Sequence, residues 1–198
     1  FNHYLTETFP AAVAQAKTMG AVIFFVDEAS VRSDAHRGLS WAKVGETPVV
    51  RNSGGRFNLN VISAVSPRGD MRFSFIDGKT DSKKFIAFLK KLYKDAAKPI
   101  LVITDNARYH HSKATQSFVE EQDGNIQMVF LPAYSPELNP DEQVWNHAKA
   151  RLSKRSIFTK EDMKVGLLSV LRSIQKQTTL IESFFRMKDT RYIVEAIE

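Results

Sequence analysis

Three acidic residues stand out because each lies next to a segment that can hold a side chain rigidly. Asp27 closes the apolar run AVIFFVD, and Asp105 closes the run PILVITD. Segments this rich in Val, Ile and Phe are typical of strands buried on both faces of a sheet. Carboxylates at the carboxyl ends of such strands face the crevice where ligands bind. The third acid, Glu142, follows a proline-rich turn and is expected in the first turn of a helix.

The predicted start of this helix leaves two alternatives open. Asn139 suits the N-cap, a proline follows it, and Glu142 then falls at the third helical position. A glutamate at this position can bind the N-cap amide as part of a capping box, which is a purely structural role. Asp141 is a second candidate for the third acid, and adjacent helical positions point about 100° apart. Glu142 is favoured because it shares a helix face with Asn146 and Lys149.

Together these acids indicate a site for divalent metal ions. Mg²⁺ prefers oxygen ligands, keeps several waters and is usually held by a few carboxylates together with substrate phosphates. Two such ions about 3.5–4 Å apart can serve both the attacking and the leaving oxygen in phosphoryl displacement. Without metal, neighbouring carboxylates repel one another, which raises at least one pKa. We therefore expect Mg²⁺, or Mn²⁺ as a substitute, and two ions.

The other segments predict a mixed sheet with helices on both sides. Residues 30–52 have the turn residues of a hairpin, and RFNLNVISAV and MRFSF alternate apolar and polar side chains, as antiparallel strands do. After them the pattern predicts a helix opened by Asp81 or Ser82, the strand that ends at Asp105, a helix over 112–122, the strand IQMVFLP, and the helix that begins near Glu142. The expected order is therefore three antiparallel strands, followed by helix, strand, helix, strand and helix. This is the order of elements in a ribonuclease-H-like α/β domain.

Three parts are expected along the chain. Residues 1–20 form a linker and N-terminal helix, residues 21–157 the ribonuclease-H-like domain, and residues 158–198 a C-terminal helical extension packed on it. The extension opens with a capping-box pattern from Thr159 to Asp162. Its apolar residues suit either cover for the sheet or a dimer interface, and the sequence leaves both open.

Composition narrows the class of protein. The 198 residues suffice for one substantial domain, and 43% hydrophobic with 25% charged residues is ordinary for a globular protein. There is no cysteine, which excludes a disulfide framework and a thiolate zinc site. No apolar run approaches the roughly 20 residues of a membrane span. With no signal peptide visible, an intracellular place is expected, in the cytoplasm or nucleoid of a bacterium or the nucleus of a eukaryote. The formal charge of +6 favours a polyanionic partner.

Several motifs resemble one family of enzymes. VDEAS around Asp27, TDNARYHHS around Asp105 and YSPELNPDEQVW around Glu142 are similar, in this order, to the three acidic motifs of the Tc1/mariner and IS630 group of DDE transposases. The segment RGLSWAKVGETPVV resembles the second-strand region of the same family. The resemblance covers roughly Val22 to Leu152, and three motifs in order are far more specific than one.

The resemblance implies a DDE catalytic triad at Asp27, Asp105 and Glu142, with the same residues as metal ligands. It departs from the family at Asp141, where an apolar residue is usual. Such an enzyme cleaves a phosphodiester at the transposon end with water and then joins the 3′-hydroxyl to double-stranded target DNA, typically at TA. It acts as a homodimer or higher assembly when two ends are brought together. The upstream helix-turn-helix domains of the family are absent from this sequence.

Further residues are candidates for contacts with DNA. His110 stands where the family often has a histidine, so a phosphate or active-site hydrogen bond is as plausible as a local turn role. A basic cluster next to the acidic helix start is expected to contact the DNA backbone, although a solvated helix end is the alternative. The candidates on this helix and just after it are Asn146, Lys149, Arg151, Lys154 and Arg155.

Two more residues near the acids have expected roles. Asn106 is expected either to orient Asp105 or to cap the following helix. Trp145 is expected to pack against the sheet rather than to stack on a base, because an aromatic residue one turn into a helix commonly anchors it.

Two other functions remain alternatives to a transposase. A structure-selective nuclease on the same fold would cut DNA with metal without joining ends. A domesticated DNA-binding protein would have lost the chemistry, although retention of all three acids argues against it. A glycosidase with paired carboxylates is a remote third, and activity without metal would identify it.

Overall fold

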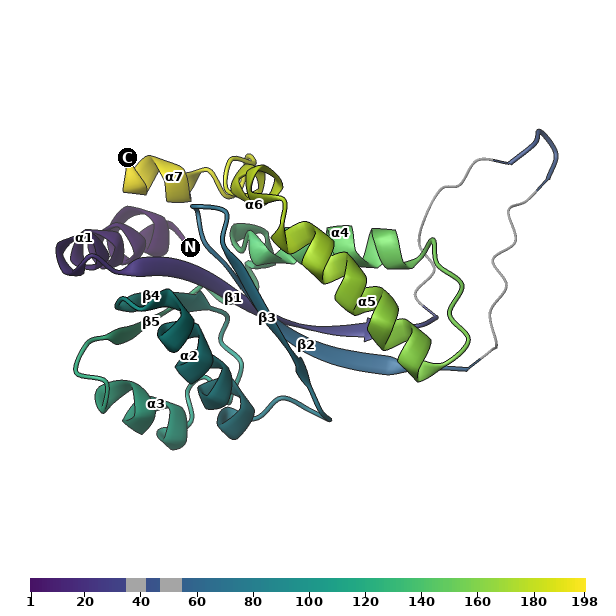
Figure 1. Cartoon of the computed structure of the whole chain (residues 1–198). Helices are drawn as coiled ribbons and strands as arrows, with labels where there is room; N and C mark the ends of the chain where they lie inside the picture. The colour runs from purple at the N-terminus through teal and green to yellow at the C-terminus, as the bar shows by residue number, and fades with distance from the viewer. Residues whose placement is uncertain (35–41, 47–54) are drawn as a thin grey trace.

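A five-stranded mixed sheet forms the centre of the molecule (Figure 1). The computed structural model describes residues 1–34, 42–46 and 55–198. The sheet order is β3-β2-β1-β4-β5, with β1 antiparallel to β2, β2 antiparallel to β3, and β4 parallel to both β1 and β5. The strands are β1 (Val22–Arg32), β2 (Asn58–Val65), β3 (Met71–Ile76), β4 (Ile100–Thr104) and β5 (Ile126–Phe130). This confirms the predicted ribonuclease-H-like arrangement.

Strand β1 is longer than the sequence predicted. Its parallel pairing with β4 ends at Phe25 opposite Ile103, whereas its antiparallel pairing with β2 continues to Arg32 opposite Asn58. Asp27 therefore lies within β1, just past the point where β4 stops, and not at the end of the strand. Because side chains alternate along a strand, Asp27 and Glu28 point to opposite faces of the sheet.

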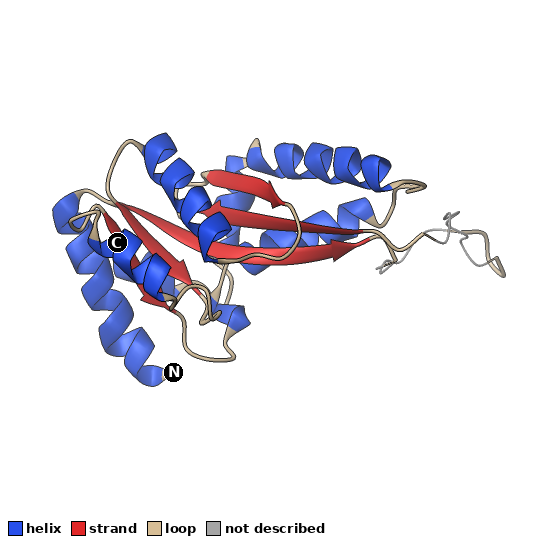
Figure 2. Cartoon of the chain, turned by 90° about the horizontal axis from the view of Figure 1, so that it is seen from below, coloured by secondary structure: helices blue, strands red, loops and turns tan. Residues whose placement is uncertain are grey.

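Helices cover both faces of the sheet (Figure 2). On one face, α2 (Ser82–Ala96) and α3 (Lys113–Glu120) pack over apolar residues such as Phe24, Val26 and Val102. A larger core lies on the other face, where Trp145 of α4 meets Phe25 of β1 and Leu171 of α5. The helices of this second face are α1 (Phe9–Met19), α4 (Asp141–Leu152), α5 (Lys160–Gln175), α6 (Thr178–Phe184) and α7 (Tyr192–Ile197).

Side-chain caps fix several helix starts where the sequence placed them. The Asp81 side chain accepts a hydrogen bond from the Lys84 amide at 2.9 Å, which begins α2. Ser112 caps α3 in the same way. Thr159 and Asp162 form the predicted capping box of α5. Such caps satisfy amide groups that have no partner within the helix.

The C-terminal helices cover the sheet, which was one of their two expected roles. Phe185 packs against Phe25 with 5.8 Å between ring centroids, and Ile174 and Ile181 are fully buried in the same core. Phe9 of α1 also belongs to this core. The division into residues 1–20, 21–157 and 158–198 stays a prediction, although all three segments contribute to one core.

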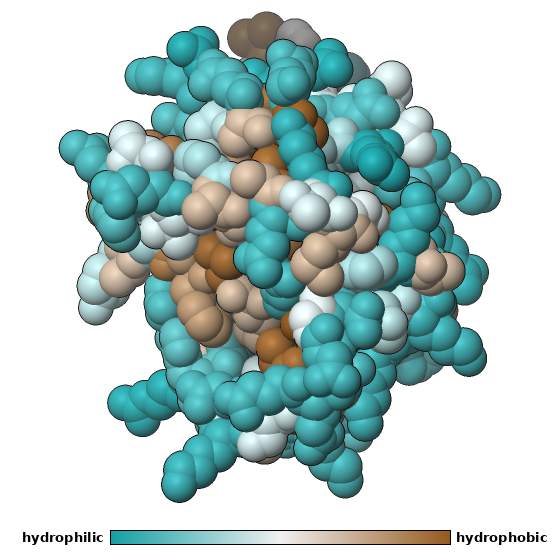
Figure 3. Space-filling view, turned by 90° about the vertical axis from the view of Figure 1, so that its left-hand side faces the viewer, coloured by the Kyte–Doolittle hydropathy of each residue, from teal (hydrophilic) through white to brown (hydrophobic). Residues whose placement is uncertain are grey.

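Most of the predicted hairpin over 30–52 lies outside the described residues. At the end that carries α1, apolar surface is exposed between hydrophilic side chains (Figure 3). Among the helices of the described ranges, none is both long and apolar enough to cross a membrane.

Candidate active site

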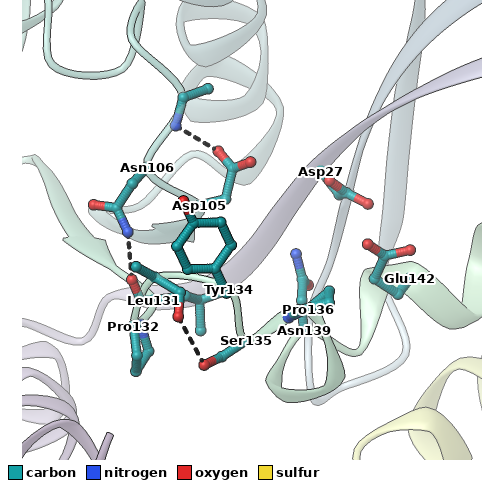
Figure 4. A pocket seen from close by; sticks show the side chains of 12 residues that line it. Asp27, Asp105, Asn106, Leu131, Pro132, Tyr134, Ser135, Pro136, Asn139 and Glu142 are labelled. Carbon is teal, nitrogen blue, oxygen red and sulfur yellow. Dashed lines mark hydrogen bonds between the residues drawn. The ribbon is translucent and has the colours of Figure 1, made fainter.

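The three predicted acids line one pocket of about 450 Å³ at the carboxyl end of the parallel strands (Figure 4). Asp27 comes from β1, Asp105 directly follows β4, and Glu142 lies in the first turn of α4. The carboxyl groups of Asp27 and Glu142 lie beside each other, and Asp105 lies across the pocket. Residues far apart in the chain thus meet at the edge where α/β sheets bind ligands.

Asp27 is held on the face of the sheet that α4 covers. It lies opposite Ser63 of β2 in the antiparallel ladder. Burial raises the pKa of Asp27 well above its usual value, and the neighbouring charges of Asp141, Glu142, Glu28 and Asp105 raise it further. A cation beside Asp27 would favour its ionised form, whereas the neighbouring carboxylates disfavour that form.

The turn before α4 fixes the helix start against β1. The Asn139 side-chain oxygen accepts from the Asp141 amide at 3.0 Å, and its side-chain nitrogen donates to the Val26 carbonyl at 3.3 Å. The helix begins at Asp141, one residue later than predicted. The capping-box role considered for Glu142 is wrong, because the Asn139 amide donates to the Pro136 carbonyl at 2.9 Å.

Asp141 and Glu142 are separated by the helix geometry. Asp141 is fully buried, and its carboxyl accepts a hydrogen bond from the Ser63 hydroxyl at 2.7 Å. Burial raises the pKa of Asp141 well above its usual value. Glu142 is half-buried and lines the pocket. Its pKa is also raised by burial and by Asp105, while Lys149 lowers it. The geometry thus directs Glu142, and not Asp141, into the pocket.

Asp105 is held by a buried histidine. One ring nitrogen of His110, Nδ1, lies 3.0 Å from the Asp105 carboxylate and 3.0 Å from the Asp105 carbonyl. The other ring nitrogen, Nε2, lies 3.3 Å from the Glu28 carboxylate. The hydrogen bond from His110 lowers the pKa of Asp105, which outweighs the effect of burial. The ring is therefore an anchor for a pocket acid.

His110 lies between two carboxylates, which favour its protonated form. Burial lowers the pKa of His110, but hydrogen bonds to Asp105 and Glu28 outweigh it and raise the pKa to about 9. Glu28, Asp105 and His110 offer ligand atoms within 4.8 Å of one another. A protonated imidazole does not bind metal, so His110 stands in the place of a cation here. Its ring is buried and makes the active-site hydrogen bond that was one of its expected roles, whereas a direct DNA contact of His110 stays a prediction.

Sequence reasoning missed Glu28. The signal was present, because Glu28 follows Asp27 in a strand and must point to the opposite face, where the segment after Asp105 passes. Its partner could not be identified from spacing alone, since Glu28 and His110 are 82 residues apart in the chain.

The basic candidates lie along and after α4, on the far side of Glu142. Lys149, Lys154 and Arg155 are exposed, as is Asn146. Arg155 also donates to the Ser169 hydroxyl of α5 at 3.4 Å, and half-buried Arg151 donates to Ser173 at 3.5 Å. The guanidinium groups are therefore oriented against α5, whereas Lys149 lies close enough to Glu142 to lower its pKa.

The structure contradicts both expected roles of Asn106 and confirms the expected role of Trp145. Asn106 neither orients Asp105 nor caps α3: its side chain donates to the Leu131 carbonyl at 2.6 Å, and Ser112 is the cap. Trp145 is 1% exposed and packs in the core, as expected.

The fold and the pocket define a ribonuclease-H-like domain with three converging carboxylates. The family model described as DDE superfamily endonuclease matches residues 22–164. The chain therefore belongs to the DDE superfamily endonuclease family, and its matches lie in the IS630 and Tc1/mariner groups of transposases.

Two curated relatives carry the sequence likeness. The insertion element IS630 uncharacterized 39 kDa protein of Shigella sonnei is 30% identical over 127 residues, which is 62% of this chain and 36% of that protein. The Tc3 transposase of Caenorhabditis elegans is 25% identical over 183 residues, which is 86% of this chain and 54% of that protein. The chain thus spans about half or less of the length of these relatives.

Solved structures agree in fold. The Mos1 mariner paired end complex with Mn has a TM-score of 0.65 at 17% identity, with 100% of this chain and 64% of that chain covered. The catalytic domain of Mos1 mariner transposase has a TM-score of 0.57 at 14% identity, with 100% and 96% covered. The likeness extends over the whole chain, including the C-terminal helices.

Proposed function

We propose that this chain is the catalytic domain of a cut-and-paste DNA transposase that cleaves at transposon ends and joins 3′-hydroxyl ends to target DNA. The observation that carries the proposal is the convergence of Asp27, Asp105 and Glu142 in one pocket. A carboxylate cluster on a chain of net charge +6 suits an enzyme that holds cations and acts on a polyanion.

The donor set of the pocket fits divalent metal ions. Its three carboxylates are hard oxygen ligands, and the raised pKa values of Asp27 and Glu142 reflect negative charge gathered in a buried place. Asp27, Asp105 and Glu142 would hold Mg²⁺ or Mn²⁺, and two ions are proposed. When bound, they supply charge stabilisation for phosphoryl displacement. Mos1 structures with Mg and with Mn support this assignment.

The side chains of the protein contribute orientation. His110 holds the Asp105 carboxylate through Nδ1 and lowers its pKa, so Asp105 stays ionised and fixed in direction. Asn139 ties the start of α4 to β1, which sets Glu142 against Asp27. Positioning of this kind is the main share of a protein in phosphoryl transfer.

Double-stranded DNA is the proposed substrate and partner. Lys149 lies close enough to Glu142 to lower its pKa, and Lys154 and Arg155 are exposed just after α4, so all three suit contacts with backbone phosphates of DNA that reaches the pocket. We propose the same for Arg151 and Asn146, and a TA dinucleotide as target. Paired-end and strand-transfer complexes of Mos1 support an assembly of two or more copies on DNA ends.

Metal binding is the first test, because cleavage by this chain alone can fail for want of other parts of the protein. Mn²⁺ titration calorimetry is run on the wild type, Asp105→Asn and Glu121→Gln, with and without a short DNA duplex. Glu121 is an exposed acid at the end of α3 and serves as the matched control. We expect heat of binding for the wild type and the control, and none for Asp105→Asn. Equal binding by all three would overturn the metal site, and binding by none would favour the domesticated protein.

A further inference from the structure

Tyr134 has an unusual position at the pocket. Its side chain is 100% exposed, although it lines the same pocket as the three acids. Its backbone has φ of 57°, in the left-handed region that a bulky residue rarely adopts. Within the described parts of the chain, the Tyr134 ring has no aromatic contact and its hydroxyl no hydrogen bond. The ring is thus displayed to solvent by a costly backbone conformation.

The loop that carries Tyr134 is fixed on both sides. Before it, the Leu131 carbonyl accepts from the Asn106 side chain at 2.6 Å. Asn106 is itself held by His111, whose ring lies 4.0 Å from that of Phe130. After it, the Leu138 carbonyl accepts from the Tyr192 hydroxyl at 3.0 Å. These hydrogen bonds come from different elements, so the exposed position of Tyr134 is imposed by the fold.

The left-handed backbone conformation of Tyr134 destabilises the folded protein, and no packing of its side chain in the described part of the chain compensates for this. A left-handed conformation at a residue other than glycine costs on the order of 1–3 kcal/mol and persists where the surroundings impose it. A buried ring would offset such a cost by packing, but the Tyr134 ring buries nothing. Within the described residues, no packing of the ring offsets this cost.

We infer that Tyr134 is a stacking platform for a nucleobase of the DNA strand whose backbone enters the acidic pocket. The inference rests on the proposed function. An aromatic face accepts any base without sequence preference, and stacking contributes about 1–3 kcal/mol per base. The ring lines the same pocket and lies on the Asp105 side of it, with Asp27 and Glu142 on the opposite side (Figure 4). A strand with a phosphate at the carboxylates therefore brings a neighbouring base within reach of Tyr134.

Other ligands of an exposed tyrosine suit this place less well. An apolar peptide or a lipid would bring no group that matches three adjacent carboxylates. A nucleic acid brings phosphates, which together with cations complete the shell around such acids, and flat bases for the ring. The pocket and the ring thus match two parts of one ligand.

The test measures stacking without cleavage. A DNA duplex with a short single-stranded overhang carries 2-aminopurine in the overhang beside the junction, and its fluorescence falls when the base stacks on an aromatic ring. The titration is made in Ca²⁺ with the wild type, Tyr134→Phe, Tyr134→Ala and Tyr134→Gly. Tyr134→Phe keeps the ring and removes the hydroxyl, and Tyr134→Gly removes the ring while relieving the backbone strain. Circular dichroism and thermal melting establish that each variant is folded.

We expect the wild type and Tyr134→Phe to quench the probe, and the Ala and Gly variants to leave it bright and bind the DNA roughly 5- to 150-fold more weakly. Quenching by Tyr134→Ala equal to that of the wild type would overturn the inference, as would absence of quenching by the wild type. Metal-dependent cleavage of the same duplex is measured separately. Cleavage by the wild type together with unchanged quenching in Tyr134→Ala would reject the stacking role and leave the proposed function standing.

Discussion

Two groups of ionisable side chains lie at the same end of the sheet on opposite faces, and they differ in how charge is compensated. The histidine cluster, Glu28, Asp105 and His110, lies toward α2 and α3 and contains its own cation. The pocket cluster, Asp27, Asp141 and Glu142, lies toward α4 and consists of acids, of which Asp27 and Glu142 line the pocket and Asp141 is buried behind it.

The difference is visible in the direction of each pKa shift. In the histidine cluster, the pKa of Asp105 is lowered by its hydrogen bond from His110. In the pocket cluster, the pKa values of all three acids are raised, with burial as the first cause. One cluster therefore has a compensating group within the protein, and the other is the place that the proposed metal ions would occupy. Asp105 connects them, because it also lines the pocket.

The largest expected effect separates the two neighbouring acids of the pocket cluster. Glu142→Gln should reduce metal-dependent strand cleavage roughly a thousandfold, because a lost ligand removes several kcal/mol of charge stabilisation. Asp141→Asn keeps the shape of a buried carboxyl outside the pocket and should retain far more activity. Cleavage assays in Mg²⁺ and Mn²⁺ check both. Retention of cleavage by Glu142→Gln and its loss in Asp141→Asn would show that the third ligand is wrongly assigned.

A second variant removes the internal cation of the histidine cluster. His110→Leu leaves the partly buried Glu28 beside an apolar side chain and should lower the free energy of unfolding by about 3 kcal/mol. The melting temperature should fall by roughly 6–12 °C. Adding Glu28→Gln removes the unpaired charge, so the double variant should be more stable than the sum of the single effects. A double-mutant cycle by thermal melting without metal measures this coupling, and strict additivity would contradict it.

The smallest expected effects are changes in the stability of the fold, and they should have opposite signs in the two clusters. Without metal, the raised pKa of Asp27 means that stability is lost as pH rises and the carboxyl ionises, so Asp27→Asn should stabilise the chain by roughly 1 kcal/mol at neutral pH. The pKa of Asp105 is lowered in the folded chain. Ionised Asp105 therefore stabilises the fold at any pH above its pKa in the unfolded chain, and Asp105→Asn should destabilise the chain. Melting curves from pH 4 to pH 8 check the sign of both effects, and the effect of Asp105→Asn should be the smaller one because solvent screens this exposed carboxyl group. Shifts of equal sign would remove the distinction between the clusters.

Much of this arrangement could be predicted from the sequence because its cause is local. The apolar runs before Asp27 and Asp105 and the helix start before Glu142 indicate strands and a helix, and the order of elements gives the fold. The length of β1 was missed because pairing with β2, more than 25 residues away, extends it beyond Asp27.

Other features depend on contacts that spacing does not encode. The burial of His110 is decided by Glu28, Phe85 and Tyr109, which pack around its ring. The helix start at Asp141 is decided by the hydrogen bonds of Asn139 to β1 and to the helix. The position of Tyr134 depends on a loop held by Asn106, which precedes it in the chain, and by Tyr192, which follows it near the C-terminus. Long-range contacts of this kind become visible only in the folded molecule.

The alternation of side chains along β1 makes this strand intolerant of changes in length. Asp27 and Glu28 supply one acid to each cluster only because they point to opposite faces. A single-residue insertion or deletion between Val22 and Asp27 would exchange the two faces, since a strand repeats every two residues. A deletion would turn Glu28 toward the pocket and Ala29 toward His110, whereas an insertion would turn Asp27 toward His110 and Val26 toward the pocket. Among relatives with this architecture, gaps in an alignment should therefore avoid this half of β1 and gather in the loops around the sheet.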